Sequence, residues 1–323
     1  MPPAPPNYDY SGVIPTEMAA QIIQEAAQYS TVLQLANLVP MGTQINELPI
    51  PKTLPSANWV AAPGGRKPFT ELALQTQVLR AEEVAAVTAI PEQYLEDTAV
   101  NLWGWVRPRL AEAIAVAIDR AIIFGVGAPG SFPPGGIVAP ANTFSTPVAA
   151  GYDAVDMVNM GMGAVEGRGL AVNGHAADLV VKSILRGQRD LNGSLLMGET
   201  QVDQGARPTI YGVPVAYNPF AVTTGANFLT GAWQYLMVGI RQDIRYTMDP
   251  NAVIADAQGA VVISGFQDNV VPLKVWGRFA CAIVRPVTTR VPGGAVPFAR
   301  ATLPAWTPPP PAEDAAEART AKK

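Results

Sequence analysis

The 323-residue sequence is poor in charge, in cysteine and in histidine. Charged residues make up 15% of it, well below the roughly 25% of an ordinary soluble domain. Its single cysteine, Cys281, excludes an intrachain disulfide and a cysteine-based zinc site, and its single histidine, His175, excludes sites built on a histidine pair. The composition therefore argues against redox and metal chemistry, and we expect no cofactor.

Long unbroken apolar runs are also missing. The two longest stretches without a charged residue, 121–152 and 208–240, are interrupted by prolines and glycines. Neither supplies the ~20 apolar residues of a membrane-spanning helix. The proline-rich N-terminus also lacks the basic and apolar regions of a secretory signal. We therefore expect no membrane partner, and we expect a chain with 49% hydrophobic residues to bury its surface in a large oligomer.

The charge is also unevenly placed along the chain. The formal net charge is -4, which argues against gripping nucleic acid through a basic face. No lysine or arginine precedes Lys52, whereas Asp9, Glu17, Glu25 and Glu47 do. Such a region would not adhere to nearby nucleic acid, and chance in a charge-poor segment explains the pattern equally well.

The first ninety residues predict an arm, two helices and a long hairpin. Four prolines make residues 1–12 an extended arm. Apolar residues at helical spacing predict a helix over 15–30 and a shorter one over 31–38. Residues 42–51 and 79–90 have the composition of strands and can pair as a hairpin.

The tip of this hairpin carries apolar side chains that a two-stranded projection cannot bury. Trp59, Val60 and Phe69 are the clearest examples. We therefore predict that they contact a neighbouring subunit, together with the adjacent cations Arg66 and Lys67.

A long amphipathic helix is predicted over residues 98–124, ending at Gly125. Pro108 interrupts its apolar stripe, and the carbonyl with which a proline ring clashes belongs to Gly104. The pair predicts a bend in the helix. Two interpretations stay open: the bend lets two parts of the subunit flex, or it is a fixed kink that fits the helix to a sheet.

The rest of the chain predicts a mixture of helices and strands. We expect a helix over 153–166, a strand over 170–173 and a helix over 175–191 capped by Asn173. Further strands are expected over 209–217, 234–240, 243–248 and 270–285. The last of these alternates most cleanly, because Leu273, Val275, Phe279, Cys281 and Ile283 share one face while Lys274, Trp276 and Arg278 share the other.

The few motifs that could carry chemistry have simpler structural explanations. Gly125, Gly127 and Gly130 spell G-x-G-x-x-G, but they follow a helix where a dinucleotide site follows a strand. His175 has no identifiable partner, and we interpret it as a capping or surface histidine. Cys281 is interpreted as a small buried hydrophobe.

A run of carboxylates gives equally little support to acid–base catalysis. Glu82 and Glu83 are adjacent on a predicted strand and therefore face opposite sides. Glu92, Glu96 and Asp97 are interpreted as a solvated or intersubunit surface. We expect no catalytic residue.

Three groups of motifs, in this order along the chain, resemble the major capsid proteins of tailed phages with the Hong Kong 97-like fold. They are Gly12–Glu17 leading to Ser30–Leu33; then Ala57–Val60 with Val84–Val87 and Ile90–Asp97; then Tyr211–Val215 with Val238–Asp243 and Gln267–Asn269. The resemblance covers about residues 12–292.

The resemblance implies an α+β fold of five parts. They are an N-terminal arm (1–41), an extended β-hairpin loop (42–90), a peripheral domain with a long spine helix (91–151 and 260–306), an axial domain (152–259) and a flexible C-terminal tail (307–323). Some family members form an isopeptide bond from the extended loop. Lys67 is the candidate for it here, although Lys67 beside Arg66 could equally bind a neighbour's carboxylates.

The resemblance also implies the function and the partners. The chain is expected to be a structural subunit that assembles as hexamers and pentamers into an icosahedral shell enclosing double-stranded DNA without sequence-specific binding. Scaffold, portal and decoration proteins are further expected partners, with assembly in the host cytoplasm and the virion as destination. An encapsulin-type compartment shell and a monomeric soluble enzyme stay open as alternatives.

Overall fold

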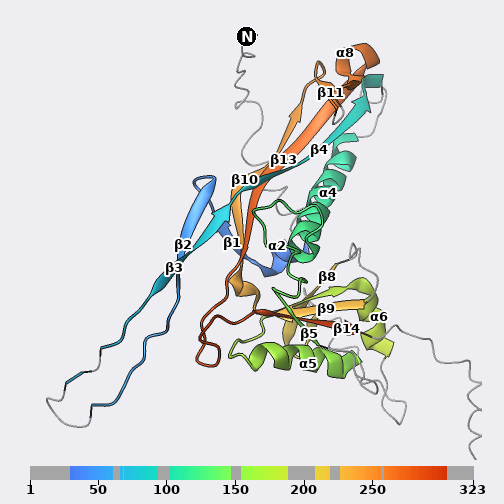
Figure 1. Ribbon diagram of the computed structural model, residues 1–323. Helices are drawn as coiled ribbons and strands as arrows, with labels where there is room; N and C mark the ends of the chain where they lie inside the picture. The colour runs from blue at the N-terminus through green and yellow to red at the C-terminus, as the bar shows by residue number, and fades with distance from the viewer. Residues whose placement is uncertain are drawn as a thin grey trace, which may run out of the picture.

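The computed structural model describes residues 30–60, 66–67, 69–93, 102–146, 154–187, 208–218, 226–255 and 258–303. Within these ranges the chain is a mixed α+β fold with two main sheets, as the composition of predicted elements indicated (Figure 1). The predicted arm over 1–12, the helix over 15–30 apart from Ser30, and the tail over 307–323 lie outside the described residues.

The first main sheet has four strands in the order β1-β10-β13-β4. β1 (Asn37–Pro40) runs parallel to β10 (Leu236–Met248), and β13 (Val270–Ile283) pairs antiparallel with both β10 and β4 (Glu82–Pro91). β13 therefore lies in the middle of a long sheet, which Figure 1 shows as the upper part of the molecule.

The alternation predicted for β13 holds from Leu273 to Phe279, and this apolar face packs on the long helix. Farther along, Ala280 and Ala282 of the opposite face are also buried and Ile283 is only partly buried, so the end of the strand is covered on both sides. Leu273, Val275, Phe279 and Cys281 are buried in one cluster with α4 (Leu102–Phe124). The stripe of α4 supplies Leu110, Ile114, Ile118, Ala121 and Ile122 to that cluster. Each large aliphatic or aromatic side chain buried in this way contributes about 1.5–3 kcal/mol, so this contact is the main core of the upper part.

The second main sheet has six strands in the order β5-β14-β9-β6-β8-β7. Two helices, α5 (Ala154–Glu166) and α6 (Leu179–Gly187), pack against it and share a core with it. Figure 1 places this sheet below the first, with α5 along its lower side. Its strands are β5 (Phe144–Thr146), β6 (Gly174–Asp178), β7 (Thr209–Ile210), β8 (Val213–Asn218), β9 (Ala226–Gly231) and β14 (Phe298–Leu303).

The smaller elements complete the described chain. They are the helices α2 (Thr31–Leu35) and α8 (Gly265–Asp268), the 3₁₀ turn η1 (Trp233–Tyr235), and two two-stranded ladders, β2 (Ile45–Pro51) with β3 (Leu74–Arg80) and β11 (Val253–Ala255) with β12 (Val261–Ser264). None of the helices in the described ranges combines the length and the apolar character that crossing a membrane requires.

The predicted hairpin exists, but its second strand was placed wrongly. β2 pairs with β3, and the predicted partner segment 79–90 is divided at Ala81, which is buried. Beyond Ala81 the chain pairs with β13 along the whole of β4. The core sheet offers β4 a longer ladder and a buried face, whereas the projecting hairpin offers neither.

Two predicted helices exist, but their boundaries were wrong. The one over 31–38 ends at Leu35, because Ala36 is extended and residues 37–40 pair with β10. The one over 175–191 begins only at Leu179, because residues 174–178 form β6 between β8 and β9. Its predicted cap, Asn173, instead accepts a hydrogen bond from Trp233 N at 2.7 Å. Tertiary pairing outweighed local helix propensity at both places.

The other strand predictions were partly right. β7 and β8 divide the segment 209–217 at a turn, and the segments 234–240 and 243–248 form one strand, β10, with irregular pairing near Gln242. The predicted strand over 170–173 has no regular structure. β9 and β14, which are neighbours in the six-stranded sheet, were not predicted.

The predicted helix end at Gly125 is confirmed. Gly125 has a φ of +68°, and Gly125 N donates to Ala121 O at 3.1 Å, as in the αL C-cap motif. A Cβ on Gly125 would lie 2.5 Å from the backbone carbon of Gly135. A Cβ on Gly127, at φ +70°, would meet nothing within 4 Å. Gly125 and Gly127 thus shape a helix-ending loop, in a motif that only resembles a phosphate cradle.

We predict that Gly125→Ala destabilises the subunit by at least ~2 kcal/mol more than Gly127→Ala. Both variants carry the ~1 kcal/mol strain of a left-handed residue, but only the first forces backbone against backbone. Chemical denaturation of the two variants and the parent measures the difference. Equal losses of unfolding free energy in the two variants would contradict the described loop packing.

Candidate functional site

The β2–β3 hairpin projects from the body of the molecule, and Figure 1 shows its two legs leaving at the lower left. The ladder joins Ile45 to Arg80 at its base and Pro51 to Leu74 at its outer end. Farther out, Thr53 Oγ1 accepts from Ala73 N at 2.9 Å, and Thr70 Oγ1 donates to Ser56 O at 2.7 Å. These side-chain bonds hold the legs together where the backbone ladder has ended.

The hairpin carries large apolar side chains that have no core around them. Trp59 is fully exposed and Phe69 is 91% exposed. Large exposed apolar side chains continue toward the base of the legs, and they are Ile45, Leu54, Val60, Leu72, Leu74 and Val78. Exposed apolar patches of this extent mark interaction surfaces in soluble proteins.

The structure brings the five predicted contact residues to this projection. Trp59 and Val60 lie on one leg, Phe69 lies on the other, and Arg66 and Lys67 are exposed between them. Their contact with a neighbouring subunit remains a prediction. Of the predicted bend pair, Gly104 and Pro108 both lie within α4, and the helix continues through Pro108.

The two edges of the hairpin differ in their hydrogen-bonding capacity. Lys52 N donates to Ala73 O and Ala81 N donates to Gln44 O, so the even-numbered residues of β2 bond to β3. The backbone nitrogens of Pro49 and Pro51 therefore face outward, where proline has no N–H to offer. The outer edge of β2 thus keeps only the N–H groups of Ile45 and Glu47, while β3 keeps the backbone groups of its outer edge.

A second exposed apolar surface lies at the opposite end of the long sheet, where Figure 1 labels β11 and α8. It consists of Val253 on β11, Val261 and Val262 on β12, and Phe266 on α8. Phe266 is 80% exposed. This surface was not predicted from the sequence, although the run Val261-Val262-Ile263 between Gly259 and Gly265 was a signal for a short hairpin.

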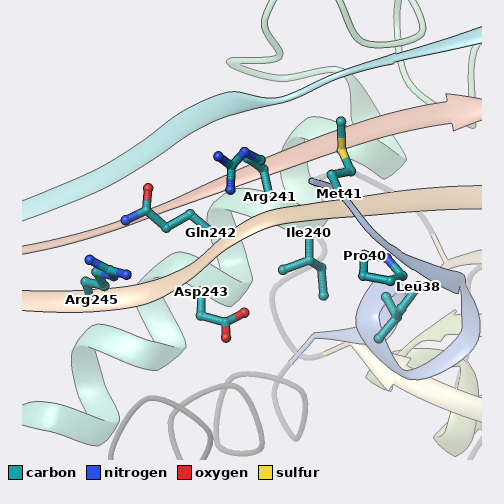
Figure 2. A pocket seen from close by; sticks show the side chains of 8 residues that line it. All are labelled: Leu38, Pro40, Met41, Ile240, Arg241, Gln242, Asp243 and Arg245. Carbon is teal, nitrogen blue, oxygen red and sulfur yellow. The ribbon is translucent and has the colours of Figure 1, made fainter. Parts of the chain in front are cut away.

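A shallow groove lies where β1 ends against β10. It is lined by Leu38, Pro40 and Met41 on one side and by residues 240–243 and Arg245 on the other. Figure 2 shows Ile240 and Asp243 on one side of β10, and Arg241 and Gln242 on the opposite side. Beyond Ile240, no strand of the described part of the chain pairs with this outer edge of β10.

The residues that could have carried chemistry are buried or paired. His175 is completely buried on β6, where the sequence predicted a capping or surface residue, and burial lowers its pKa to about 4. Burial raises the pKa of the Cys281 thiol to about 12, which keeps it protonated. Glu83 lies 3.7 Å from Lys274 and 3.9 Å from Arg278 across the sheet. Glu96 and Asp97 lie outside the described residues.

The part of the chain that the structure describes contains no candidate metal-binding site. No group of three or more histidine, cysteine, aspartate or glutamate side chains comes together there. The described body carries exposed apolar surfaces at both ends of its long sheet.

We predict that replacing Pro49 and Pro51 together by alanine opens the outer edge of β2 to non-specific pairing. The double variant should fold normally but associate irregularly, because two N–H groups become available on an exposed strand. Light scattering at matched protein concentration measures the effect, and Pro55→Ala, beyond the ladder, is the control. Equal scattering from both variants would show that the prolines do not protect this edge.

Comparison with known proteins agrees with this arrangement. A model of the phage capsid family matches residues 11–289. The probable major capsid protein gp17 of Mycobacterium phage L5 is 27% identical over 295 residues, covering 84% of this chain and 86% of that protein. The major capsid protein of Staphylococcus phage 80alpha is 23% identical, with 81% and 79% of the two chains covered.

Solved structures resemble the whole described body. A chain from Mycobacterium phage Adephagia superposes with a TM-score of 0.69 at 25% identity, covering 87% of this chain and 91% of that one. A chain from the capsid of an empty GTA particle reaches a TM-score of 0.60 at 18% identity, which shows the fold alone. The resemblance drawn from three groups of motifs is confirmed.

Proposed function

The chain belongs to the phage capsid family, and from this premise we infer that it is a major capsid protein, a structural subunit of the icosahedral head shell of a tailed phage. The single observation that carries the shell-building role is the projecting hairpin with its exposed Trp59 and Phe69. A subunit with such a projection becomes stable in water by placing it on another subunit.

The hairpin supports assembly into rings. It contacts a different surface on the neighbour, so the interface is heterologous, and heterologous interfaces close into rings when the rotation permits. The charge-poor composition and the apolar surface at the β11–α8 end support further contacts between rings. Hexamers and pentamers are the rings that an icosahedral shell requires.

The division into domains follows the two sheets. We assign α4 as the spine helix, the four-stranded sheet to the peripheral domain and the six-stranded sheet with α5 and α6 to the axial domain. Sheet membership favours two changes to the boundaries expected from sequence. β10 goes with the peripheral domain although it lies within 152–259, and β5 and β14 go with the axial domain although they lie outside that range.

The remaining partners follow from the same role. The shell encloses double-stranded DNA without sequence-specific contacts, which the formal net charge of -4 supports. Scaffold, portal and decoration proteins are its further partners, with assembly in the host cytoplasm and incorporation into the virion. We assign no catalytic role, because His175 and Cys281 are buried and the carboxylate of Glu83 faces cations.

Negative-stain microscopy and mass measurement of the purified protein test this function. Shells or rings support it, whereas a single species near 34.0 kDa at all concentrations supports the soluble-enzyme alternative. An encapsulin-type shell would share the fold, and it differs by enclosing a protein cargo where a phage head encloses a genome.

We predict that Trp59→Ala slows shell assembly and lowers the temperature at which shells come apart. The indole is lost from an intersubunit pocket, which costs about 2 kcal/mol or more when an aromatic anchor is removed. Leu179→Ala, an equally simple truncation of an exposed side chain on α6, is the matched control. Assembly and heat stability that match the control would mean that the hairpin is not an intersubunit clamp.

We predict that Pro108→Ala gives subunits that fold normally but shells that expand slowly or incompletely. A proline inside a helix costs about 3 kcal/mol, and a cost of that size suggests that the bend is used when the peripheral domain moves against the axial domain. Small-angle scattering follows shell radius during expansion. Expansion at the parental rate would support the fixed-kink interpretation instead.

A further inference from the structure

Asp119 is a buried carboxylate on α4, and no cationic side chain among the described residues forms an ion pair with it. It is 2% exposed, and its neighbours on α2 and β8 are all uncharged. The adjacent Arg120 forms no ion pair with it within the described residues. An isolated charge in such a place is costly unless hydrogen bonds hold it.

Four donors from two other elements converge on this carboxylate. Ser30 Oγ donates to Oδ1 at 2.6 Å and Val32 N donates to Oδ1 at 3.1 Å. Thr31 N donates to Oδ2 at 2.8 Å, and Asn218 Nδ2 donates to Oδ2 at 2.8 Å. Ser30 Oγ in turn accepts from Leu33 N at 3.1 Å, which completes the first turn of α2.

This hydrogen-bond network joins three elements of the fold. Ser30 is the N-cap of α2, α4 belongs to the core of the four-stranded sheet, and Asn218 ends β8 of the six-stranded sheet. α2 contacts both α4 and β8, as Figure 1 shows. One carboxylate therefore links three parts of the subunit that are far apart in the sequence.

We propose that Asp119 is the residue that positions α2 in the subunit. By capping α2 and binding Asn218 together, it ties the start of α2 to α4 and to the six-stranded sheet. The proposal concerns the isolated subunit, and only its importance for the shell rests on the proposed function.

The charge state of Asp119 makes this anchor sensitive to pH. Burial raises its pKa from 3.8 to about 6, and the hydrogen bonds from Ser30, Thr31, Val32 and Asn218 act against that shift because they stabilise the carboxylate. α2 and β8 carry no charged side chain. Neither element therefore adds a second titrating group to the pH dependence of the hydrogen bonds to Asp119. When the hydrogen bonds to Asp119 open, water reaches the carboxylate and its pKa returns toward 3.8. The closed network, which we call the anchor, is therefore favoured most below pH 3.8.

The pKa of Asp119 is higher in the closed state than in the open state, and this difference determines the direction of the pH effect. The advantage of the closed anchor is lost as pH rises through about 6, because the ionised carboxylate is better solvated in the open state. Each pH unit between the two pKa values changes the opening equilibrium tenfold. Opening at the α2 root should therefore increase up to about a hundredfold between pH 4 and pH 7.

Hydrogen exchange of the full-length subunit, read at Thr31 and Val32, tests the proposal. After correction for intrinsic exchange rates, protection at these amides should fall between pH 4 and pH 7 in the parent. Asp119→Asn should abolish this pH dependence, and Asp119→Ala should speed exchange at least tenfold at pH 7 while β13 amides stay protected. Glu112→Gln, which removes a surface carboxylate from the same helix, should behave like the parent.

The outcomes separate a positioning role from a general structural one. An unchanged pH profile in Asp119→Asn, or exchange in Asp119→Ala no faster than in Glu112→Gln, overturns the proposal. If Asp119→Ala does not fold, Asn218→Ala replaces it, because it removes one donor and should still speed exchange at Thr31 and Val32. Subunits that show these effects but never form shells would overturn the proposed function and leave this inference standing.

Discussion

The packing of α4 against one face of β13 is the contact on which the rest of the subunit depends. The helix stripe and the strand face bury each other in a single cluster that also contains Val32, Trp233 and Phe298. Trp233 and Phe298 come from the region of the six-stranded sheet, so the same cluster reaches both parts of the molecule. Remove this contact and neither the long sheet nor its junction with the second sheet has a core.

Large apolar side chains that this core does not bury lie at the two ends of the long sheet. The β2–β3 hairpin and the β11–α8 end leave Trp59, Phe69 and Phe266 exposed. Such a division suits a protein whose work is association, because the surfaces that need a partner lie away from the core. The prolines on the outer edge of β2 fit the same logic, since an unpaired edge would otherwise invite the wrong neighbour.

Local sequence patterns predicted the elements in which each face keeps the same surroundings, core or solvent, along most of the element. The β13 alternation, the α4 stripe and its end at Gly125, and α5 were all recognisable, because period and capping are properties of a short segment. The segments that failed were those whose partners decide their state. Residues 174–178 have no strong strand composition, yet they form β6 because β8 and β9 flank them. Likewise the second leg of the hairpin was misplaced, since two strands separated only by Ala81 pair in different sheets.

The family, the mixed class of the fold, the low charge and the apolar tip of the hairpin could be predicted from the sequence, because these depend on residue type and order. The positions of the buried polar groups could not, because they depend on tertiary contacts. His175 was interpreted as a capping or surface residue and proved to be a completely buried strand residue, and Asp119 drew no attention in the sequence at all. Hydrogen bonds from Ser30, Thr31, Val32 and Asn218 meet on that one carboxylate. No local pattern relates residues 30 to 32, 119 and 218, because folding alone brings them within bonding distance.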